Sequence, residues 1–370
     1  MEVDVISLRQ GDGEPLRGSV NGVSILRVPL KHWRGGKLGY VFQYGSFTLI
    51  SMILLAWRSM TRRYDLVHVH NMPDFLVFSA LVPKLCGAKV ILDLHDPMPE
   101  LMMTIFGLER ERFAVRVLRK LENWSIRFAD IVLTPNLAFQ KLFAARNSRV
   151  DKIRVIMNSP DDTIFHYHEL NGRVPASRES AMTFVIMYHG ALVERHGLDI
   201  AVQALETVRK RIPNAELRIF GRPTPFVHQV MENVSERGLG KAVHYLGEKT
   251  LEKIAEAIDE CDVGIIPNRR SVFTELNLPT RIFENLARGK PVIAPLTPGI
   301  RDYFTSEELV FFQPGDANDL ASKLQYVFSQ PREVNETVRR GQKVYLAHRW
   351  DEERSKLKLL VSELLNKGAR

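Results

Sequence analysis

The sequence has few of the features that mark secreted, metal-bound or membrane-spanning proteins. Its 370 residues include only two cysteines, Cys86 and Cys261, which lie far apart and form neither a disulfide framework nor a metal-ligand pattern. Residues 1–7 lack the basic and apolar regions of a signal peptide. The apolar stretch 44–57 has 14 residues, fewer than the roughly 20 that span a bilayer. We therefore expect a globular protein in the reducing environment of the cytoplasm.

Several functional motifs are also missing. No predicted strand is followed by Gly-x-Gly-x-x-Gly, which argues against a dinucleotide-dependent oxidoreductase. No repeat of solenoid length and no low-complexity segment is present. No nucleic-acid recognition motif or aromatic-interleaved basic run occurs either, so we expect no nucleic-acid partner.

Acidic residues are scarce in the first half of the chain. The net charge is +8, and residues 1–160 hold 22 Lys and Arg against 14 Asp and Glu, whereas residues 161–370 hold 29 of each kind. The whole excess of positive charge therefore lies in the first half. Without a nucleic-acid motif, this excess favours an anionic membrane surface or a phosphorylated acceptor as its partner.

The pattern of apolar segments predicts an α/β protein with two domains. A chain of this length exceeds one ordinary core. Strand-like and helix-like segments alternate in both halves, as they do around parallel sheets, and the polar segment 166–181 between the halves is typical of a linker. The predicted strands are 2–8, 22–29, 64–70, 88–94, 129–134, 153–158, 184–190, 215–221, 243–247, 262–267 and 292–294, and the predicted helices are 71–84, 109–128, 136–146, one from 198, 251–260, one from 316, 332–347 and 350–367.

Polar side chains gather where two strands of the first half end. Because the carboxyl ends of parallel strands meet at one edge of a sheet, we expect these side chains to border a ligand site. Contacts to an acceptor or to a transferred sugar are one interpretation, and histidines bonded to the backbone are another. A metal site is a third, since His68 and His70 share a strand and carboxylates are near. The residues at these strand ends are His70, Asn71, His95, Asp96 and Glu100.

The stretch 275–295 predicts a loop, a helix, a tight turn and a strand. Pro279 suits the first turn of the helix, and Gly289 suits the position just after its end. Glu284 is a carboxylate on this short helix. It is either solvated on the outer face or holds the hydroxyls of a ribose, with Arg281 and the helix start near Thr280 facing phosphate.

The stretch resembles the donor-site signature of retaining glycosyltransferases of the GT-B fold, family 4. That signature is Glu-x7-Glu, a small residue, Gly, x and Pro-Val-Ile/Val-Ala, and the matching residues are Glu284, Ala287, Gly289, Pro291 and Val292. Glu275 stands nine positions before Glu284 instead of eight. In the family the loop after the first strand of the second domain carries Gly-Arg and Lys-Gly, where this sequence has Ala191 and His196.

The resemblance implies a GT-B fold, in which two Rossmann-like domains face each other across a cleft and the C-terminal helix crosses back to the first domain. Residues 1–165 are expected to form an acceptor-side domain, residues 182–347 a nucleotide-sugar-binding domain, and residues 348–370 the returning helix. The family's first strand and helix are expected to be absent from this chain. In a doubly wound sheet that strand is central, so its absence would leave backbone groups unpaired.

The implied activity is transfer of a hexose from a nucleotide-diphosphate sugar to a glycan or lipid-diphosphate acceptor, with retention and without a metal or other cofactor, in cell-surface polysaccharide synthesis. No Asp-x-Asp run is present to hold a metal on the diphosphate. The alternatives are a catalytically inactive scaffold of the same fold and a truncated gene product. The implied residues are His95 and Asp96 for catalysis, His70, Asn71 and Glu100 on the acceptor side, and Gly190, Arg195, His196, Gly221, Arg222, Glu275, Thr280, Arg281 and Glu284 for the donor.

The apolar stretch 44–57 also predicts a helix, and basic residues flank it. A core helix packed on the sheet is one interpretation. The other is a helix partly seated in a membrane interface, with its basic flanks on lipid headgroups and the protein peripheral on the inner face of the cytoplasmic membrane. The flanking residues are Lys31, Arg34, Lys37, Arg58, Arg62 and Arg63.

Overall fold

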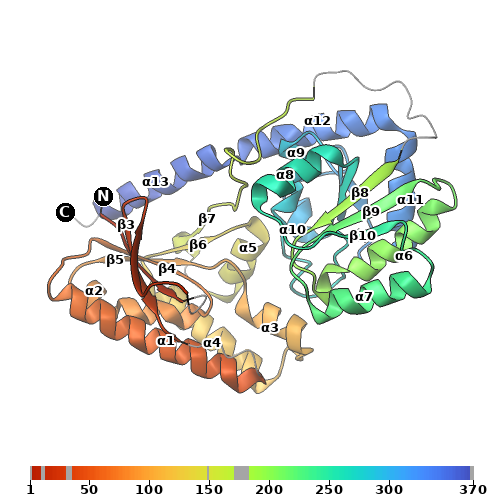
Figure 1. Ribbon diagram of the computed structural model, residues 1–370. Helices are drawn as coiled ribbons and strands as arrows, with labels where there is room; N and C mark the ends of the chain where they lie inside the picture. Colours follow the sequence, from red (N-terminus) through yellow and green to blue (C-terminus); the bar gives the residue numbers. More distant parts are fainter. Residues whose placement is uncertain (1, 10–12, 31–35, 148–149, 171–182, 367–370) are drawn as a thin grey trace. The chain divides into compact units, whose positions relative to one another are not determined.

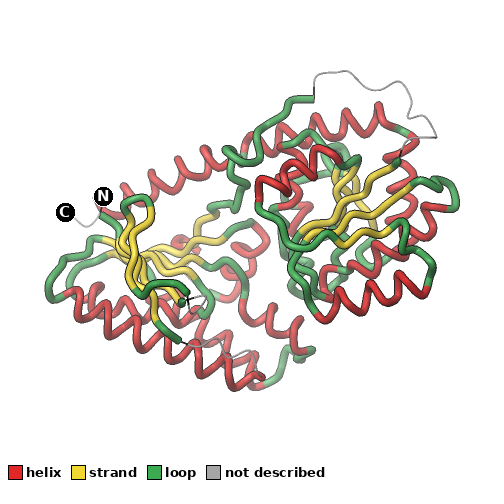
Figure 2. Tube along the Cα trace, in the orientation of Figure 1, coloured by secondary structure: helices red, strands yellow, loops and turns green. Residues whose placement is uncertain are grey.

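The computed structural model of the protein describes residues 2–9, 13–30, 36–147, 150–170 and 183–366. The chain forms two compact units, each an α/β arrangement around parallel strands (Figures 1 and 2). The predicted fold class, with two Rossmann-like domains, is confirmed. The first unit comprises residues 1–134, 140–155 and 360–370, and the second comprises residues 135–139 and 156–359.

The second unit is built on one six-stranded sheet in the order β10-β9-β8-β11-β12-β13. Every neighbouring pair in it is parallel. All six residues of β8 are buried, which is why that segment reads as a continuous apolar run. The strands are β8 (Phe184–His189), β9 (Ala215–Phe220), β10 (Val243–Tyr245), β11 (Val263–Ile265), β12 (Val292–Pro295) and β13 (Val310–Phe312).

Helices cover both faces of this sheet. Figure 1 shows α6, α7 and α11 on one side, and α11 packs on α6, while α12 packs on α9 on the other side. The helices of the unit are η3 (Glu194–His196), α6 (Leu198–Arg209), α7 (Pro225–Glu236), α8 (Leu251–Glu260), α9 (Arg281–Ala287), α10 (Pro298–Arg301), α11 (Ala317–Ser329) and α12 (Pro331–Ala347). The last helix, α13 (Trp350–Asn366), contributes its residues from Leu360 onward to the first unit.

The predicted turn after α9 is confirmed in detail. Gly289 has φ +68°, a left-handed conformation that glycine adopts without strain. The amide of Gly289 donates to the carbonyl of Leu286 at 3.0 Å, and the amide of Lys290 donates to the carbonyl of Asn285 at 2.9 Å. These two bonds form a Schellman motif, which satisfies carbonyls that the helix end leaves unpaired. The start of the helix differs from the prediction: α9 begins at Arg281, so Pro279 precedes the helix instead of occupying its first turn.

The first unit contains two sheets. A four-stranded parallel sheet has the order β4-β5-β6-β7, and a three-stranded sheet has the order β1-β3-β2. Among the described residues, β1 pairs only with β3 and β4 pairs only with β5. The absence of a central strand nevertheless stays a prediction. The strands are β1 (Asp4–Leu8), β2 (Arg17–Val20), β3 (Val23–Val28), β4 (Leu66–His70), β5 (Lys89–Asp93), β6 (Ile131–Thr134) and β7 (Ile153–Val155).

The helices of the first unit form layers over the four-stranded sheet. The 3-10 helix η1 contacts β4 and β5, and α1 packs on η1 and α2 as an outer layer. Two helix predictions need correction: the helix expected at 109–128 begins at Phe113, and the one expected at 71–84 is divided into η1 and α2. The elements are α1 (Gly36–Ser59), η1 (Asp74–Ala80), α2 (Leu81–Leu85), α3 (Met98–Phe106), α4 (Phe113–Phe128), α5 (Leu137–Arg146) and η2 (Val150–Lys152).

The packing of α12 on α9 depends on a glycine. A Cβ placed on Gly341 would lie 2.5 Å from the carbonyl oxygen of Glu308 and 2.9 Å from a methyl carbon of Leu286. We predict that Gly341→Ala lowers the free energy of unfolding by about 1–3 kcal/mol, because the added methyl overpacks this contact. Gly240→Ala is the control, since a Cβ there meets nothing within 4 Å. Urea denaturation midpoints that shift equally in the two variants would contradict the prediction.

Candidate functional site

The strand order of the second unit indicates where a ligand would bind. From β8 the chain first builds outward through β9 and β10, and it then returns to the other side of β8 to build β11, β12 and β13. In open α/β sheets, ligands bind outside the carboxyl ends of the strands at such a reversal. Here the reversal lies between β8 and β11. The segments that follow these two strands therefore border the candidate site.

Close backbone contacts hold the loop that follows β8. A Cβ on Gly197 would lie 2.0 Å from the carbonyl oxygen of Pro267, which follows β11. A Cβ on Gly221 would lie 2.2 Å from the carbonyl oxygen of Gly190. Larger side chains at these two glycines would push the loop out of place. The glycines predicted from sequence, Gly190 and Gly221, thus lie side by side at the sheet edge.

Glu284 is not on a solvated outer face. Its Oε2 lies 2.6 Å from Nε2 of His189, the last residue of β8, and the two side chains are 14% and 8% exposed. The carboxylate of α9 is therefore fixed against the end of the central strand. Burial of an ionised carboxylate is costly unless it is hydrogen-bonded, and His189 supplies that bond.

Arg281 lies beside this pair. Its Nη1 donates to the carbonyl oxygen of His189 at 2.7 Å, and its guanidinium carbon lies 4.9 Å from the centre of the Tyr188 ring. A Cβ on Gly190 would meet the Arg281 side chain at 3.4 Å. The guanidinium is thus positioned at the loop between β8 and α6, where a phosphate could also reach backbone amides.

His196 does not supply the positive charge that a lysine would bring to its position. Burial, followed by the charge of Arg281, lowers the pKa of His196 to about 3. The imidazole is therefore neutral at pH 7. Its Nδ1 lies 2.8 Å from the carbonyl oxygen of Ala191, and because a carbonyl can only accept, Nδ1 carries the proton. Among the residues predicted for the donor, the positive charge must come from arginines.

The remaining predicted donor residues have other partners. Arg222 is 79% exposed in its side chain, and its Nε donates to Glu248 at 2.6 Å. Glu275 forms an ion pair with Arg270 at 3.3 Å, and its carbonyl accepts from the amide of Gly299 at 2.9 Å. The carbonyl of Thr280 accepts from the amides of the first turn of α9. Arg195 lies in η3, within the loop that borders the site.

In the first unit, the strand ends bring together a cluster of three histidines and one carboxylate. The Oδ2 of Asp93 lies 3.4 Å from Nε2 of His68, 3.3 Å from Nδ1 of His70 and 3.5 Å from Nε2 of His95. Burial of Asp93 opposes its ionisation. The hydrogen bonds from His68 and His70 and the charge of His95 outweigh that effect and hold the pKa of the Asp93 carboxyl below its usual range.

Asn71 fixes the backbone at this end of the sheet. Its side-chain oxygen accepts from the amide of His95 at 2.9 Å, and its side-chain nitrogen donates to the carbonyl of Asp96 and to Asp74 at 2.9 Å each. The predicted neighbours Asn71, His95 and Asp96 are thus brought together. The role that the structure gives to Asn71 is to position the loop after β5.

Glu100, predicted for the acceptor side, is only 5% exposed. Its carboxylate is paired with Arg146, which also donates to the buried Glu122 at 3.2 Å. Burial raises the pKa of Glu122 to about 8, against the opposing charge of Arg146. Glu100 therefore belongs to a buried network that joins α3, α4 and α5.

Two groups in these sites were not predicted from sequence. The sequence predicts only that His189 lies in a strand, and no local pattern links it to Glu284. Asp93 was read as a strand residue, although its spacing of two from His95 places both side chains on one face of the sheet. The same spacing relates His68 to His70. Two such pairs of residues on adjacent parallel strands are the sequence signal that could have revealed this cluster.

Both halves of the chain match known families. The family described as "Glycosyl transferases group 1" matches residues 175–344, and the "Glycosyl transferase 4-like domain" matches residues 1–159. The chain is 22% identical over 252 residues to the probable glycosyltransferase WbjE of Pseudomonas aeruginosa, which is 65% of this chain and 60% of that protein. It is 26% identical over 135 residues to the amylovoran biosynthesis glycosyltransferase AmsK of Erwinia amylovora, which is 36% of this chain and 33% of that protein. The chain thus spans less than two thirds of either relative.

Solved structures show the same architecture over almost the whole chain. Sucrose-phosphate synthase from Thermosynechococcus elongatus superposes with a TM-score of 0.76 at 18% identity, covering 99% of this chain and 90% of that one. Anabaena Alr3699/HepE in complex with UDP-glucose superposes with a TM-score of 0.68 at 16% identity, covering 98% and 100%. These likenesses show the GT-B fold, and the two glycosyltransferase family models match the two halves of the chain separately.

Proposed function

We propose that the protein transfers a hexose from a nucleotide-diphosphate sugar to a glycan or lipid-diphosphate acceptor in the synthesis of a cell-surface polysaccharide. The donor binds in the second unit and the reaction proceeds with retention. No metal acts on the diphosphate.

The observation that carries this proposal is the pairing of Glu284 with His189 beside Arg281, at the reversal of the strand order. An ionised carboxylate offers about four lone-pair sites, so the bond to His189 leaves capacity for the hydroxyl donors of a ribose. The guanidinium of Arg281 suits the adjacent diphosphate, because arginine binds phosphate oxygens in a planar fork. One carboxylate and one cation, both held against His189, suit the ribose hydroxyls and the diphosphate of a nucleotide.

The charge that develops on the leaving diphosphate would be met by Arg281, by Arg195 and by backbone amides of the loop after β8. Groups that are already oriented before reaction stabilise developing charge without reorganisation. Retention is proposed from the family resemblance, since the predicted site offers no evident carboxylate nucleophile. A same-face displacement is the route consistent with both points.

The names of similar proteins support the donor and the pathway class. HepE of Anabaena was solved with UDP, with UDP and glucose, and with UDP-glucose. AmsK is named for amylovoran biosynthesis. UDP is therefore the first ligand to test on this chain.

We predict that Glu284→Gln weakens UDP binding while the protein stays folded. A neutral amide loses charge-assisted bonds to ribose hydroxyls, each worth about 1.5–3 kcal/mol, so the dissociation constant should rise at least about tenfold. Isothermal titration calorimetry with UDP measures the effect. The matched control is Glu256→Gln, an exposed glutamate of α8 paired with Lys253.

An unchanged UDP affinity in Glu284→Gln would remove this carboxylate from the donor site. A second variant, His189→Ala, tests whether this histidine acts on UDP binding by positioning the Glu284 carboxylate and not by touching UDP. It leaves the carboxylate in place without its buried partner, so UDP affinity should fall although His189 itself need not touch the ligand.

An inactive scaffold of the same fold is a second candidate, favoured by Ala191 and by the neutral His196 at positions where the family carries cations. An assay of sugar transfer distinguishes an active enzyme from an inactive scaffold. If the protein is an enzyme and His95 acts on the transferred sugar, His95→Ala should lower turnover by about 10²–10⁴-fold while UDP affinity is unchanged. Release of UDP from UDP-sugars, with and without acceptor, measures turnover.

A wild-type chain that binds UDP but releases none from any UDP-sugar would support the scaffold instead. Equal losses of thermal stability and turnover in His95→Ala would assign this histidine a structural role.

We also propose that the first unit binds the anionic inner face of the cytoplasmic membrane through α1. Exposed apolar side chains of α1 recur along one face, and Leu49, Ile53 and Trp57 are 53%, 58% and 57% exposed. Phe47 of the same helix is buried in the unit and is not available for such contact. No helix in the described part of the chain is long and apolar enough to cross a bilayer.

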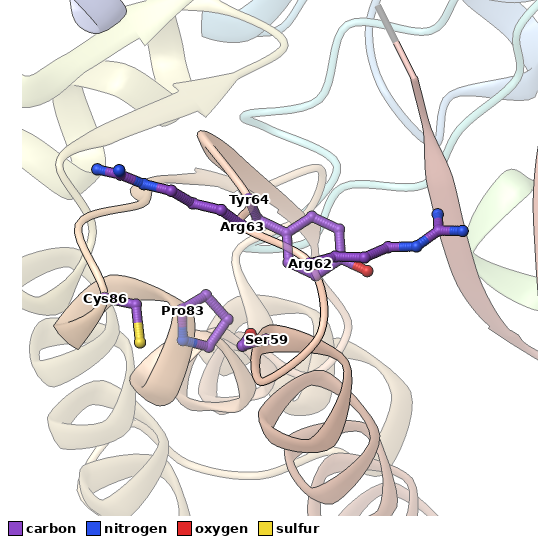
Figure 3. A pocket seen from close by; sticks show the side chains of 6 residues that line it. All are labelled: Ser59, Arg62, Arg63, Tyr64, Pro83 and Cys86. Carbon is purple, nitrogen blue, oxygen red and sulfur yellow. The ribbon is translucent and has the colours of Figure 1, made fainter.

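Basic groups follow the apolar face at the C-terminal end of α1. A pocket of about 410 Å³ there is lined by Ser59, Arg62, Arg63, Tyr64, Pro83 and Cys86. Figure 3 shows the side chains of Arg62 and Arg63 pointing in opposite directions, so they would meet separate headgroups. Arg58 and Arg62 also pair with Asp4 at 2.9 and 3.4 Å. Of the basic residues expected before the helix, Lys31 and Arg34 lie outside the described residues, as does the side chain of Lys37.

We predict that Arg58→Gln, Arg62→Gln and Arg63→Gln together lower binding to anionic liposomes by roughly tenfold or more, because each basic residue near such a surface contributes about 1 kcal/mol. Sedimentation with vesicles at low salt measures this. The control removes three charges from the second unit through Arg237→Gln, Lys253→Gln and Arg339→Gln. Equal sedimentation on neutral and anionic vesicles, or none on either, would contradict the proposal.

A further inference from the structure

The cluster of His68, His70, Asp93 and His95 brings several side chains that can ligate a metal to one place in the first unit. Three imidazole nitrogens approach the same carboxylate oxygen within 3.3–3.5 Å. In addition, Nδ1 of His70 lies 3.0 Å from Nε2 of His95. Two ring nitrogens at that distance repel each other unless a proton or a cation lies between or beside their lone pairs.

Strand geometry creates the cluster. Residues two apart on a strand point to the same face, which places His68 beside His70 on β4. On the neighbouring strand, Asp93 is the last residue of β5, and His95 follows it two positions later. The parallel register pairs His70 with Asp93 directly. The rings of His68 and His70 are stacked with centroids 4.4 Å apart, and those of His70 and His95 with centroids 5.3 Å apart. The nitrogens therefore lie in a row facing one oxygen.

We propose that His68, His70 and Asp93 bind a divalent late transition-metal ion, with Zn²⁺ as the best fit and with His95 beside the three ligands. Donor atoms of a tetrahedral zinc site, about 2.0–2.1 Å from the metal, are about 3.3 Å from one another. The distances from Oδ2 of Asp93 to Nε2 of His68 and to Nδ1 of His70, 3.4 and 3.3 Å, match this edge length. The ligand atoms of His68, His70 and Asp93 all lie within 4.8 Å of one another.

The donor set selects the class of ion. Two neutral imidazoles and one carboxylate suit Zn²⁺ and its neighbours, whereas Mg²⁺ and Ca²⁺ prefer oxygen ligands. All three ligands lie on the paired strands β4 and β5. The side chain of His70 is 58% exposed, so an ion can enter from solvent. A rigid donor set with an open approach is what a metal site needs.

Zn²⁺ bound here would take up the Asp93 carboxylate that faces Nε2 of His95 at 3.5 Å and would place a positive charge beside that imidazole, which disfavours a role for His95 in proton transfer to a transferred sugar. The site is therefore inhibitory under the proposed function, and only this consequence rests on that proposal. Metal binding itself is independent of it, because the cluster lies in the first unit and Glu284 and Arg281 lie in the second.

The test uses the full chain without a polyhistidine tag, treated with EDTA and desalted, then titrated with Zn²⁺ by calorimetry. We expect one Zn²⁺ per chain. His68→Ala and Asp93→Ala should each raise the dissociation constant at least about tenfold, because each removes a ligand. His68 is used because the proposed function assigns it no other role. His228→Ala is the matched control, an exposed histidine on α7 that should leave the affinity unchanged.

Zinc X-ray absorption of the loaded protein separates this site from adventitious binding to the exposed thiol of Cys86. We expect nitrogen and oxygen ligands at about 2.0–2.1 Å and no sulfur at about 2.3 Å. The absence of Zn²⁺ binding would overturn the proposal and leave a hydrogen-bonded cluster. An affinity unchanged in both His68→Ala and Asp93→Ala, or a sulfur ligand in the spectrum, would overturn it as well.

Discussion

The parallel direction of the six strands β8–β13 is the constraint on which the candidate donor site depends. Because all carboxyl ends lie at one edge, His189, Gly190 and Gly221 are brought together although they come from two strands. The reversal of strand order between β8 and β11 then leaves that edge open to a ligand. Gly197 and Gly221 allow the backbone of the loop to approach its neighbours more closely than any other residue would permit.

Within this frame, the pairing of His189 and Glu284 fixes a carboxylate that would otherwise be costly to bury. Arg281 adds a cation whose position is set by a backbone carbonyl and an aromatic ring, without a carboxylate partner in those contacts. The result is one anionic and one cationic group held in place before a ligand arrives. Preorganisation of this kind reduces the free energy that binding spends on ordering side chains.

The sequence predicted most elements that have local signals, with one hairpin as the exception, and missed the groups that depend on tertiary contacts. The turn at Gly289 and the buried strand after it followed from local rules. The hairpin β2–β3 was missed although Asn21-Gly22, both with positive φ, is a strong hairpin signal. His189 could not be assigned, because its partner lies 95 positions away. The histidine cluster needed the register of β4 and β5, which periodicity alone does not provide.

The central claim is that the second unit holds a nucleoside diphosphate at the carboxyl ends of β8 and β11. Hydrogen–deuterium exchange of the full chain, compared with and without saturating UDP, tests it most directly. The account predicts slower exchange in residues 188–197 and 280–288 and little change in residues 64–100 of the first unit. Protection confined to the first unit, or unchanged exchange in both segments of the second unit while calorimetry shows that UDP is bound, would contradict it.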